Sequence, residues 1–119
     1  MDKIAELEKL VQQLKRNREK VPLQDLKTKY RKAYDELRGK ISDLATEILR
    51  DQVRDIKLEP SEAYLVEEVQ TLIEGVPEEA GEALKRYDME EFKAVTEKLR
   101  TMVLQHIEKR RAENSDGLQ

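Results

Sequence analysis

The sequence has no cysteine and no tryptophan, and few glycines. Without cysteine there is no disulfide bond, no thiolate nucleophile and no cysteine-ligated zinc. The four glycines, Gly39, Gly75, Gly81 and Gly117, are too scattered to form a phosphate-binding loop. No apolar run approaches the roughly 18 residues of a membrane-spanning helix, and the N-terminal segment lacks the continuous apolar stretch of a signal peptide. We therefore expect a soluble, cytoplasmic protein without a membrane partner.

Charged residues make up 41% of the 119 residues and apolar residues 38%. This balance is typical of narrow apolar stripes on well-solvated helices. The alternating apolar pattern and the Asn-Gly turns of β-hairpins do not occur. The sequence predicts one all-α domain, residues 1–113, followed by a disordered tail, residues 114–119.

The apolar periodicity predicts a helical bundle of four main helices plus one short helix. The first helix covers residues 2–20 and ends before Pro22. A long second helix of about 35 residues should then continue to Ile56. Pro60 and Pro77 suit first helical positions and open the next two helices, which end before Gly75 and at Leu84, the second being short. Asp88 is the expected N-cap of the last helix, with Glu91 three residues later.

Gly39 lies inside the predicted long helix, where it should cost about 1 kcal/mol relative to alanine. We interpret it as the site of a close helix crossing. Helix two, being the longest, should form the spine of the bundle or protrude and pair with another chain in a coiled coil.

Charge is distributed unevenly along the chain. Residues 15–40 contain ten Lys or Arg against four Asp or Glu, whereas residues 59–91 contain eleven acidic residues against two basic ones. Basic and acidic helices can pack together within the chain or across a dimer, and we favour this interpretation because the basic stretch lacks clustered aromatic residues. The alternative is a small subunit of a nucleic-acid-binding assembly, with these candidate anion-binding residues: Lys15, Arg16, Arg18, Lys27, Lys29, Arg31 and Lys32.

No assembled catalytic motif is evident. The single histidine, His106, follows Val103 by three residues, so it does not belong to a Glu-x-x-His metal-binding pair. We interpret His106 as a residue flanking the core. The sequence predicts no catalytic residue, no metal ligand and no cofactor.

The acidic stretch "EEAGE" contains Glu78, Glu79 and Glu82 and resembles the Glu-Glu-x-x-Glu motif of all-α nucleotide pyrophosphatases of the MazG type. The second half of that motif is Glu-x-x-Asp. Here Glu97 matches its glutamate, but Arg100 stands in the place of its metal-binding aspartate. This resemblance implies Mg²⁺-dependent hydrolysis of nucleoside triphosphates in a degenerate form.

The stretch from Val76 to Gln105 resembles the helical lid of DnaK-type chaperones. The segment Glu82 to Lys85 matches the end of the lid's first helix. In the following helix the matching positions are Asp88, Glu90, Glu91, Lys93, Ala94, Thr96, Glu97, Lys98 and Leu99. The match covers about a quarter of the chain. The resemblance implies a helical cover or docking module without ATPase activity.

The sequence as a whole predicts a non-enzymatic helical module that binds another protein, or itself, through a groove or an exposed helix stripe. Chaperone association and a homodimer are both compatible with this expectation. The candidate contact residues are apolar and lie on the first two predicted helices: Leu10, Val11, Leu14 and Tyr34. The alternative is that these residues close the bundle.

Overall fold

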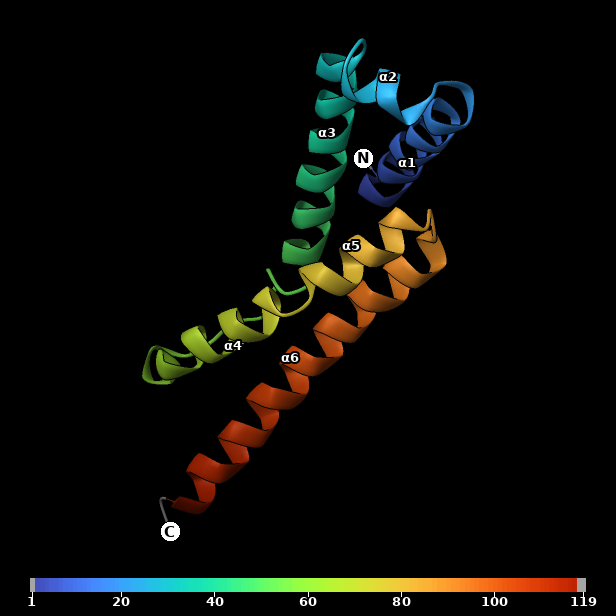
Figure 1. Ribbon diagram of the computed structural model, residues 1–119. Helices are drawn as coiled ribbons and strands as arrows, with labels where there is room; N and C mark the ends of the chain where they lie inside the picture. The colour runs from blue at the N-terminus through green and yellow to red at the C-terminus, as the bar shows by residue number, and fades with distance from the viewer. Residues whose placement is uncertain (1, 118–119) are drawn as a thin grey trace.

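The computed structural model describes the backbone of residues 2–117 and the side chains of residues 2–114, and this part of the chain is all-α, as the sequence predicts (Figure 1). The elements in chain order are α1 (Lys3–Lys20), α2 (Leu23–Lys27), α3 (Arg31–Asp51), the 3₁₀ turn η1 (Pro60–Glu62), α4 (Tyr64–Glu74), α5 (Pro77–Lys85) and α6 (Met89–Gly117). The molecule is elongated, with extents of 66 × 24 × 23 Å. Among the described helices, none is both long and apolar enough to cross a bilayer.

Helix α6 is the spine of the molecule. Its buried stripe repeats every three or four residues and consists of Phe92, Val95, Leu99, Val103 and Ile107. Helix α5 packs along the first half of this stripe and α4 along the second half, both antiparallel to α6 (Figure 1). Each fully buried side chain of this size stabilises the fold by about 2 kcal/mol.

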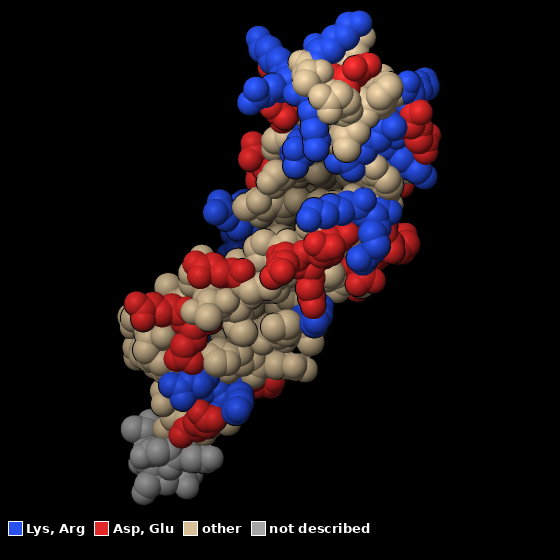
Figure 2. All heavy atoms as spheres, viewed as in Figure 1, with Lys and Arg blue, Asp and Glu red and all other residues tan. Residues whose placement is uncertain are grey.

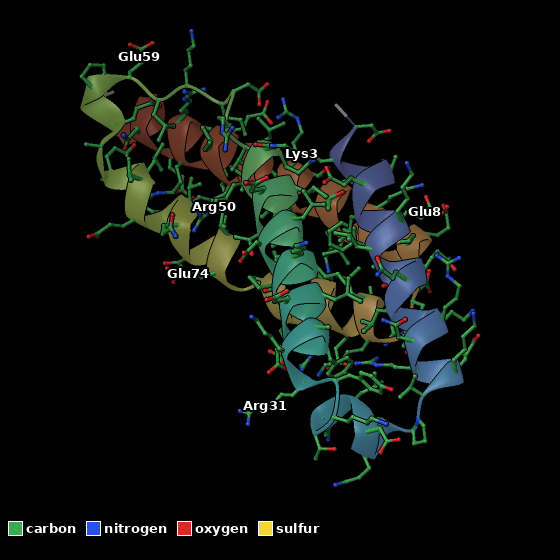
Figure 3. The ribbon with its side chains drawn as sticks, turned by 90° about the horizontal axis from the view of Figure 1, so that it is seen from above. Lys3, Glu8, Arg31, Arg50, Glu59 and Glu74 are labelled. Atoms are coloured by element: carbon green, nitrogen blue, oxygen red, sulfur yellow. The ribbon has the colours of Figure 1, made fainter. Side chains whose placement is uncertain are left out.

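Helices α1 and α3 form an antiparallel hairpin with α2 at its closed end (Figure 3). Leu7, Val11 and Leu14 of α1 are buried against the apolar face of α3. At the open end, Lys3 of α1 places its Nζ 2.7 Å from Oδ2 of Asp51, the last residue of α3. Helix α3 also contacts α6, and this contact joins the hairpin to the spine.

The prediction of one long second helix is wrong. The helix is interrupted between Lys27 and Arg31. There Thr28 Oγ1 donates a hydrogen bond to the Gln24 carbonyl, and the Tyr30 N–H donates one to the Asp25 carbonyl. In a continuous helix, Leu26 and Tyr34 would point about 80° apart. The break allows both side chains to be buried while Tyr30 stays 46% exposed. The longest helix is therefore α6.

The connection from α3 to α4 is held by two arginines of α6. Arg100 donates to the Gln52 carbonyl at 2.6 Å and to Asp55 Oδ1 at 2.7 Å, so α3 ends at Asp51 instead of reaching Ile56. Arg111 donates to both carboxylate oxygens of Glu62, at 2.5 and 2.9 Å. Glu62 is only 8% exposed and also accepts the Glu59 N–H in a capping box.

Other predicted boundaries are confirmed. Pro60 and Pro77 occupy first-turn positions of η1 and α5, and Asp88 Oδ1 accepts the Glu91 N–H at 3.0 Å at the start of α6. The tail predicted to be disordered from residue 114 instead continues α6 to Gly117. Residues 118 and 119 of that predicted tail lie outside the described residues.

The predicted helix crossing at Gly39 is wrong. A Cβ built on Gly39 meets nothing within 4 Å, so the glycine faces solvent on α3. Replacing it by alanine should raise the free energy of unfolding by about 1 kcal/mol, because alanine restricts the unfolded chain and favours the helix. Urea denaturation of Gly39→Ala measures this change. A less stable variant would contradict the open surface at Gly39 and indicate a close neighbour there.

The Glu62–Arg111 pair makes stability depend on pH. Hydrogen bonds from Arg111, and then from the Glu59 backbone, lower the pKa of Glu62 from 4.5 to about 2. Because the folded pKa is the lower one, the stabilisation is complete above the unfolded pKa and is lost as the pH falls toward 2. Glu62→Gln should therefore be less stable than the wild type at neutral pH, and the difference should vanish near pH 2.

Chemical denaturation across this pH range provides the measurement, and Glu67→Gln is the matched control because Glu67 is exposed on α4. Parallel pH profiles for the wild type and Glu62→Gln would show that the pair contributes nothing to folding.

Candidate functional site

A groove of about 600 Å³ lies between the α1–α3 hairpin and α5. It exists because α5 packs on α6, and α1 packs on α3, so that the two helical layers meet mainly where α3 touches α6. Its volume exceeds those of two further hollows on the described part of the chain, of about 430 and 400 Å³.

The walls of the groove are mostly apolar and come from all three helices. They consist of Val11 and Leu14 of α1, Ile41, Ala45 and Leu49 of α3, and Pro77, Ala80 and Leu84 of α5. Small residues make the space: Ala45 faces the groove from α3, and Ala80 and Gly81 face it from α5. A Cβ built on Gly81 meets nothing within 4 Å. A side chain added at Gly81 would therefore enter open space.

Every charged residue that lines the groove is basic. Arg18, Arg38 and Lys85 stand at its margin, and the remaining polar lining comes from Ser42 and Thr46 of α3. Lys85 is exposed and lies 3.4 Å from Glu82, a distance typical of a weak surface pair. The groove thus combines an apolar floor with a positive margin.

Arg18 is fixed in place by two tyrosines. Its Nε and Nη2 donate to the Tyr34 hydroxyl at 3.2 and 2.9 Å, and its Nη1 donates to the Tyr87 hydroxyl at 3.0 Å. Burial alone would lower the pKa of Arg18, but the hydrogen bonds to Tyr87 and Tyr34 raise it above its ordinary value. Arg18 therefore keeps its charge and links α1, α3 and the turn before α6.

Tyr87 reaches Arg18 from a backbone conformation that is rare for tyrosine. Its φ is +57°, in the left-handed region, where a glycine usually ends a helix. The Tyr87 N–H bonds to the Leu84 carbonyl at 3.0 Å and the Asp88 N–H to the Ala83 carbonyl at 2.9 Å, which is the Schellman pattern. A glycine here would form the same turn but would leave Arg18 without its second hydroxyl acceptor.

The four predicted contact residues do not form an exposed stripe, and that part of the prediction is wrong. Val11, Leu14 and Tyr34 are 1%, 6% and 4% exposed, and Leu10 is half-buried. They close the hairpin because α1 packs against α3. Val11 and Leu14 nevertheless line the groove, and Tyr34 holds Arg18 beside it.

The candidate anion-binding residues come from two sequence stretches that the fold brings to one end of the molecule. The α1 C-terminus, α2 and the start of α3 meet there, and Figure 2 shows basic side chains gathered over this end. Exposed members are Lys15, Arg16, Lys27, Lys29, Arg31 and Lys32, whereas Arg18 is partly buried. Arg31 points away from the bundle (Figure 3) and lies 3.6 Å from Asp35.

The acidic residues that resemble the pyrophosphatase motif do not converge. Glu78, Glu79 and Glu82 lie on α5, where Glu79 is 3.3 Å from Lys98 and Glu82 is beside Lys85. Within the described residues, no three acidic or histidine side chains are grouped as metal ligands would be. Arg100, at the position of the motif's aspartate, binds the α3–α4 connection instead.

His106 lies at the edge of the α4–α6 contact. Its Nε2 is 2.7 Å from Oε1 of Glu68, and Nε of Arg110 is 3.1 Å from the same oxygen. The side chain of His106 is 29% exposed and flanks Val103 and Ile107 of the core, which agrees with the prediction.

Sequence reasoning missed several groove residues, namely Arg38, Ala45, Ala80, Gly81 and Lys85. It also missed Tyr87, which does not line the groove but holds Arg18. The small residues carried a usable signal, because Ala45 and Ala80 occupy core positions where larger side chains would fill the space between helices. No comparable signal marked Arg38 or Lys85, which lie among many other charged residues. Comparison of the chain with protein-family models, with curated proteins and with solved structures gave no match.

Proposed function

We propose that the protein is a non-enzymatic docking module whose groove binds one amphipathic helix of a partner protein. The observation that carries this proposal is the combination of an apolar floor, between α1, α3 and α5, with a margin at which every charged residue is basic. A helix that presents leucine-like side chains at three- and four-residue spacing buries them in such grooves. Acidic residues flanking that apolar face complement Arg18, Arg38 and Lys85.

The dimensions of the groove support a helix as the occupant. About 600 Å³ accommodates several large apolar side chains but not a second protein layer. The walls are helices whose backbone hydrogen bonds are already satisfied, so the groove offers no strand edge for an extended peptide. The resemblance of residues 76–105 to the lid of DnaK-type chaperones fits a docking role, and association with chaperones stays a prediction.

Binding to a designed helix tests the proposal. The probe is a labelled peptide of roughly 18 residues, with leucines on one helical face and glutamates beside them. A second peptide carries lysine in place of every glutamate. Fluorescence anisotropy should show saturable binding of the glutamate peptide and at least tenfold weaker binding of the lysine peptide, because the margin of the groove is positive.

Two matched glycine variants show whether the groove is the binding site. Gly81→Leu places a side chain in the groove, whereas Gly39→Leu places the same side chain on the solvent face of α3. Gly81→Leu should lower the affinity of the protein for the glutamate peptide about tenfold. Gly39→Leu should leave this affinity unchanged. Equal binding by both variants, or preference for the lysine peptide, would refute docking in the groove.

A second candidate function is nucleic-acid binding by the basic end of the molecule. It is favoured by one observation: basic side chains gather at the end formed by α1, α2 and α3, where Tyr30 is 46% exposed and Lys29 Nζ lies 5.6 Å from its ring centre. An exposed aromatic ring among lysines and arginines can stack on an unpaired base.

Titration with a single-stranded oligonucleotide at several salt concentrations tests this alternative. Contacts to phosphates release counterions, so the affinity should fall steeply as salt rises. Tyr30→Ala should weaken binding by about tenfold if its ring stacks on a base. No detectable binding at low salt would exclude the nucleic-acid function.

A further inference from the structure

A second hollow, of about 400 Å³, lies at the basic end of the molecule between α1, α2 and α3. Five residues line it: Arg18, Leu23, Lys27, Tyr34 and Arg38. Three of these are cationic and none is acidic. We propose that this hollow binds a phosphate monoester group attached to a small apolar body.

The charge of the hollow is not neutralised by carboxylates of the chain. Arg18 is hydrogen-bonded to tyrosine hydroxyls, which are neutral, and Arg38 places its guanidinium carbon 5.6 Å from the centre of the Tyr34 ring. None of the three cations takes part in an ion pair among the described side chains. Arg18 is partly buried, and Lys27 and Arg38 are exposed beside it. Three neighbouring positive charges without a counter-charge attract a multivalent anion.

Hydrogen-bond donors remain free where the anion would bind. An arginine side chain has five N–H groups, and the hydrogen bonds to Tyr34 and Tyr87 use three of those of Arg18. The hydroxyl of Tyr34, which lines the hollow, accepts from Arg18 and so keeps its own proton for donation. Lys27 and Arg38 add further donors, and the three terminal oxygens of a phosphate can accept more of them than the two oxygens of a carboxylate.

Leu23 gives this hollow an apolar side. Leu23 is 50% exposed and lies beside Lys27 and Arg38 at the lining. The hollow is also larger than a phosphate group alone. A phosphorylated organic group places its phosphate near Arg18 and its apolar part against Leu23, whereas inorganic phosphate makes only the first contact.

This inference goes beyond helix docking and is tested separately from it. Arg18 and Arg38 line both spaces, but Gly81 lines only the groove and Lys27 lines only the hollow. Gly81→Leu should therefore leave phosphate binding intact. Failure of the peptide to bind the groove would have no bearing on the hollow.

The experiment follows the arginine Nε–H signals of the ¹⁵N-labelled full chain by nuclear magnetic resonance. Phenyl phosphate is titrated at constant ionic strength against sodium chloride. The Arg18 and Arg38 signals should move and saturate in the roughly millimolar range, while those of Arg54 and Arg110 stay fixed. Inorganic phosphate should bind more weakly than phenyl phosphate, and Leu23→Ser should remove this difference.

Two variants of equal charge provide the control. Lys27→Gln should lower the affinity for phenyl phosphate about fivefold. Lys29→Gln, two residues away and outside the hollow, should leave this affinity unchanged. Equal losses of affinity in both variants would overturn the proposal, as would uniform shifts of all arginine signals that do not saturate. Either result would indicate nonspecific attraction of the anion to positive charge.

Two further ligands show which kind of molecule carries the phosphate. A phosphotyrosine peptide that binds more tightly than phenyl phosphate would identify a phosphorylated protein as the source, and weaker binding would identify a free phosphorylated metabolite; both outcomes support the site. An oligonucleotide that displaces phenyl phosphate and binds more tightly would overturn the proposal and assign these residues to a nucleic-acid surface.

Discussion

The buried stripe of α6 is the constraint on which the rest of the structure depends. Phe92, Leu99 and Val103 are fully buried, and α3, α4 and α5 all reach the core through contact with this helix. Because α4 and α5 lie end to end along one helix, the molecule is long and narrow instead of compact. The groove follows from the same arrangement, since α5 is committed to α6 and leaves a space toward α1 and α3.

The arginines of this fold differ in whether their charge is neutralised by a carboxylate of the chain. Arg100 and Arg111 hold the α3–α4 connection against α6 through carboxylate and carbonyl partners, so their charges are neutralised within the chain. Arg18 has hydroxyl partners only, and its charge stays available beside both hollows. Part of the uneven charge of the sequence is therefore neutralised by ion pairs within the chain. Basic side chains remain on the surface at the end formed by α1, α2 and α3 (Figure 2).

The helix periodicity and the capping residues were sufficient to predict the fold class and most boundaries, because proline, aspartate and apolar spacing act locally. The break near Thr28 was harder, since its only sign was an irregular spacing between Leu26 and Tyr34 that a continuous helix can also tolerate. Gly39 was misread because a glycine at a crossing and a glycine facing solvent look the same in sequence. The end of α3 depends on Arg100, 49 residues after Asp51, and no local rule connects the two.

The candidate site was less predictable than the fold. The sequence identified Val11, Leu14 and Arg18 as residues of interest but assigned exposure to a stripe that α3 covers. The groove arises from where α5 does not pack, and the position of an unfilled space depends on the arrangement of three helices. The contact between Arg18 and Tyr87 was equally hard to predict from the sequence, because Tyr87 reaches Arg18 only through a left-handed turn.

Intermolecular nuclear Overhauser effects between the bound glutamate-flanked peptide and the methyl groups of the protein test the central claim most directly. Docking in the groove predicts contacts from the peptide leucines to the methyl groups of Leu14, Ile41 and Leu84, which line it. It also predicts no contacts to Val66 or Leu104, which are exposed apolar residues elsewhere on the surface. Contacts confined to Val66 and Leu104 would contradict the account, because the peptide would then adhere to exposed apolar surface and leave the groove empty.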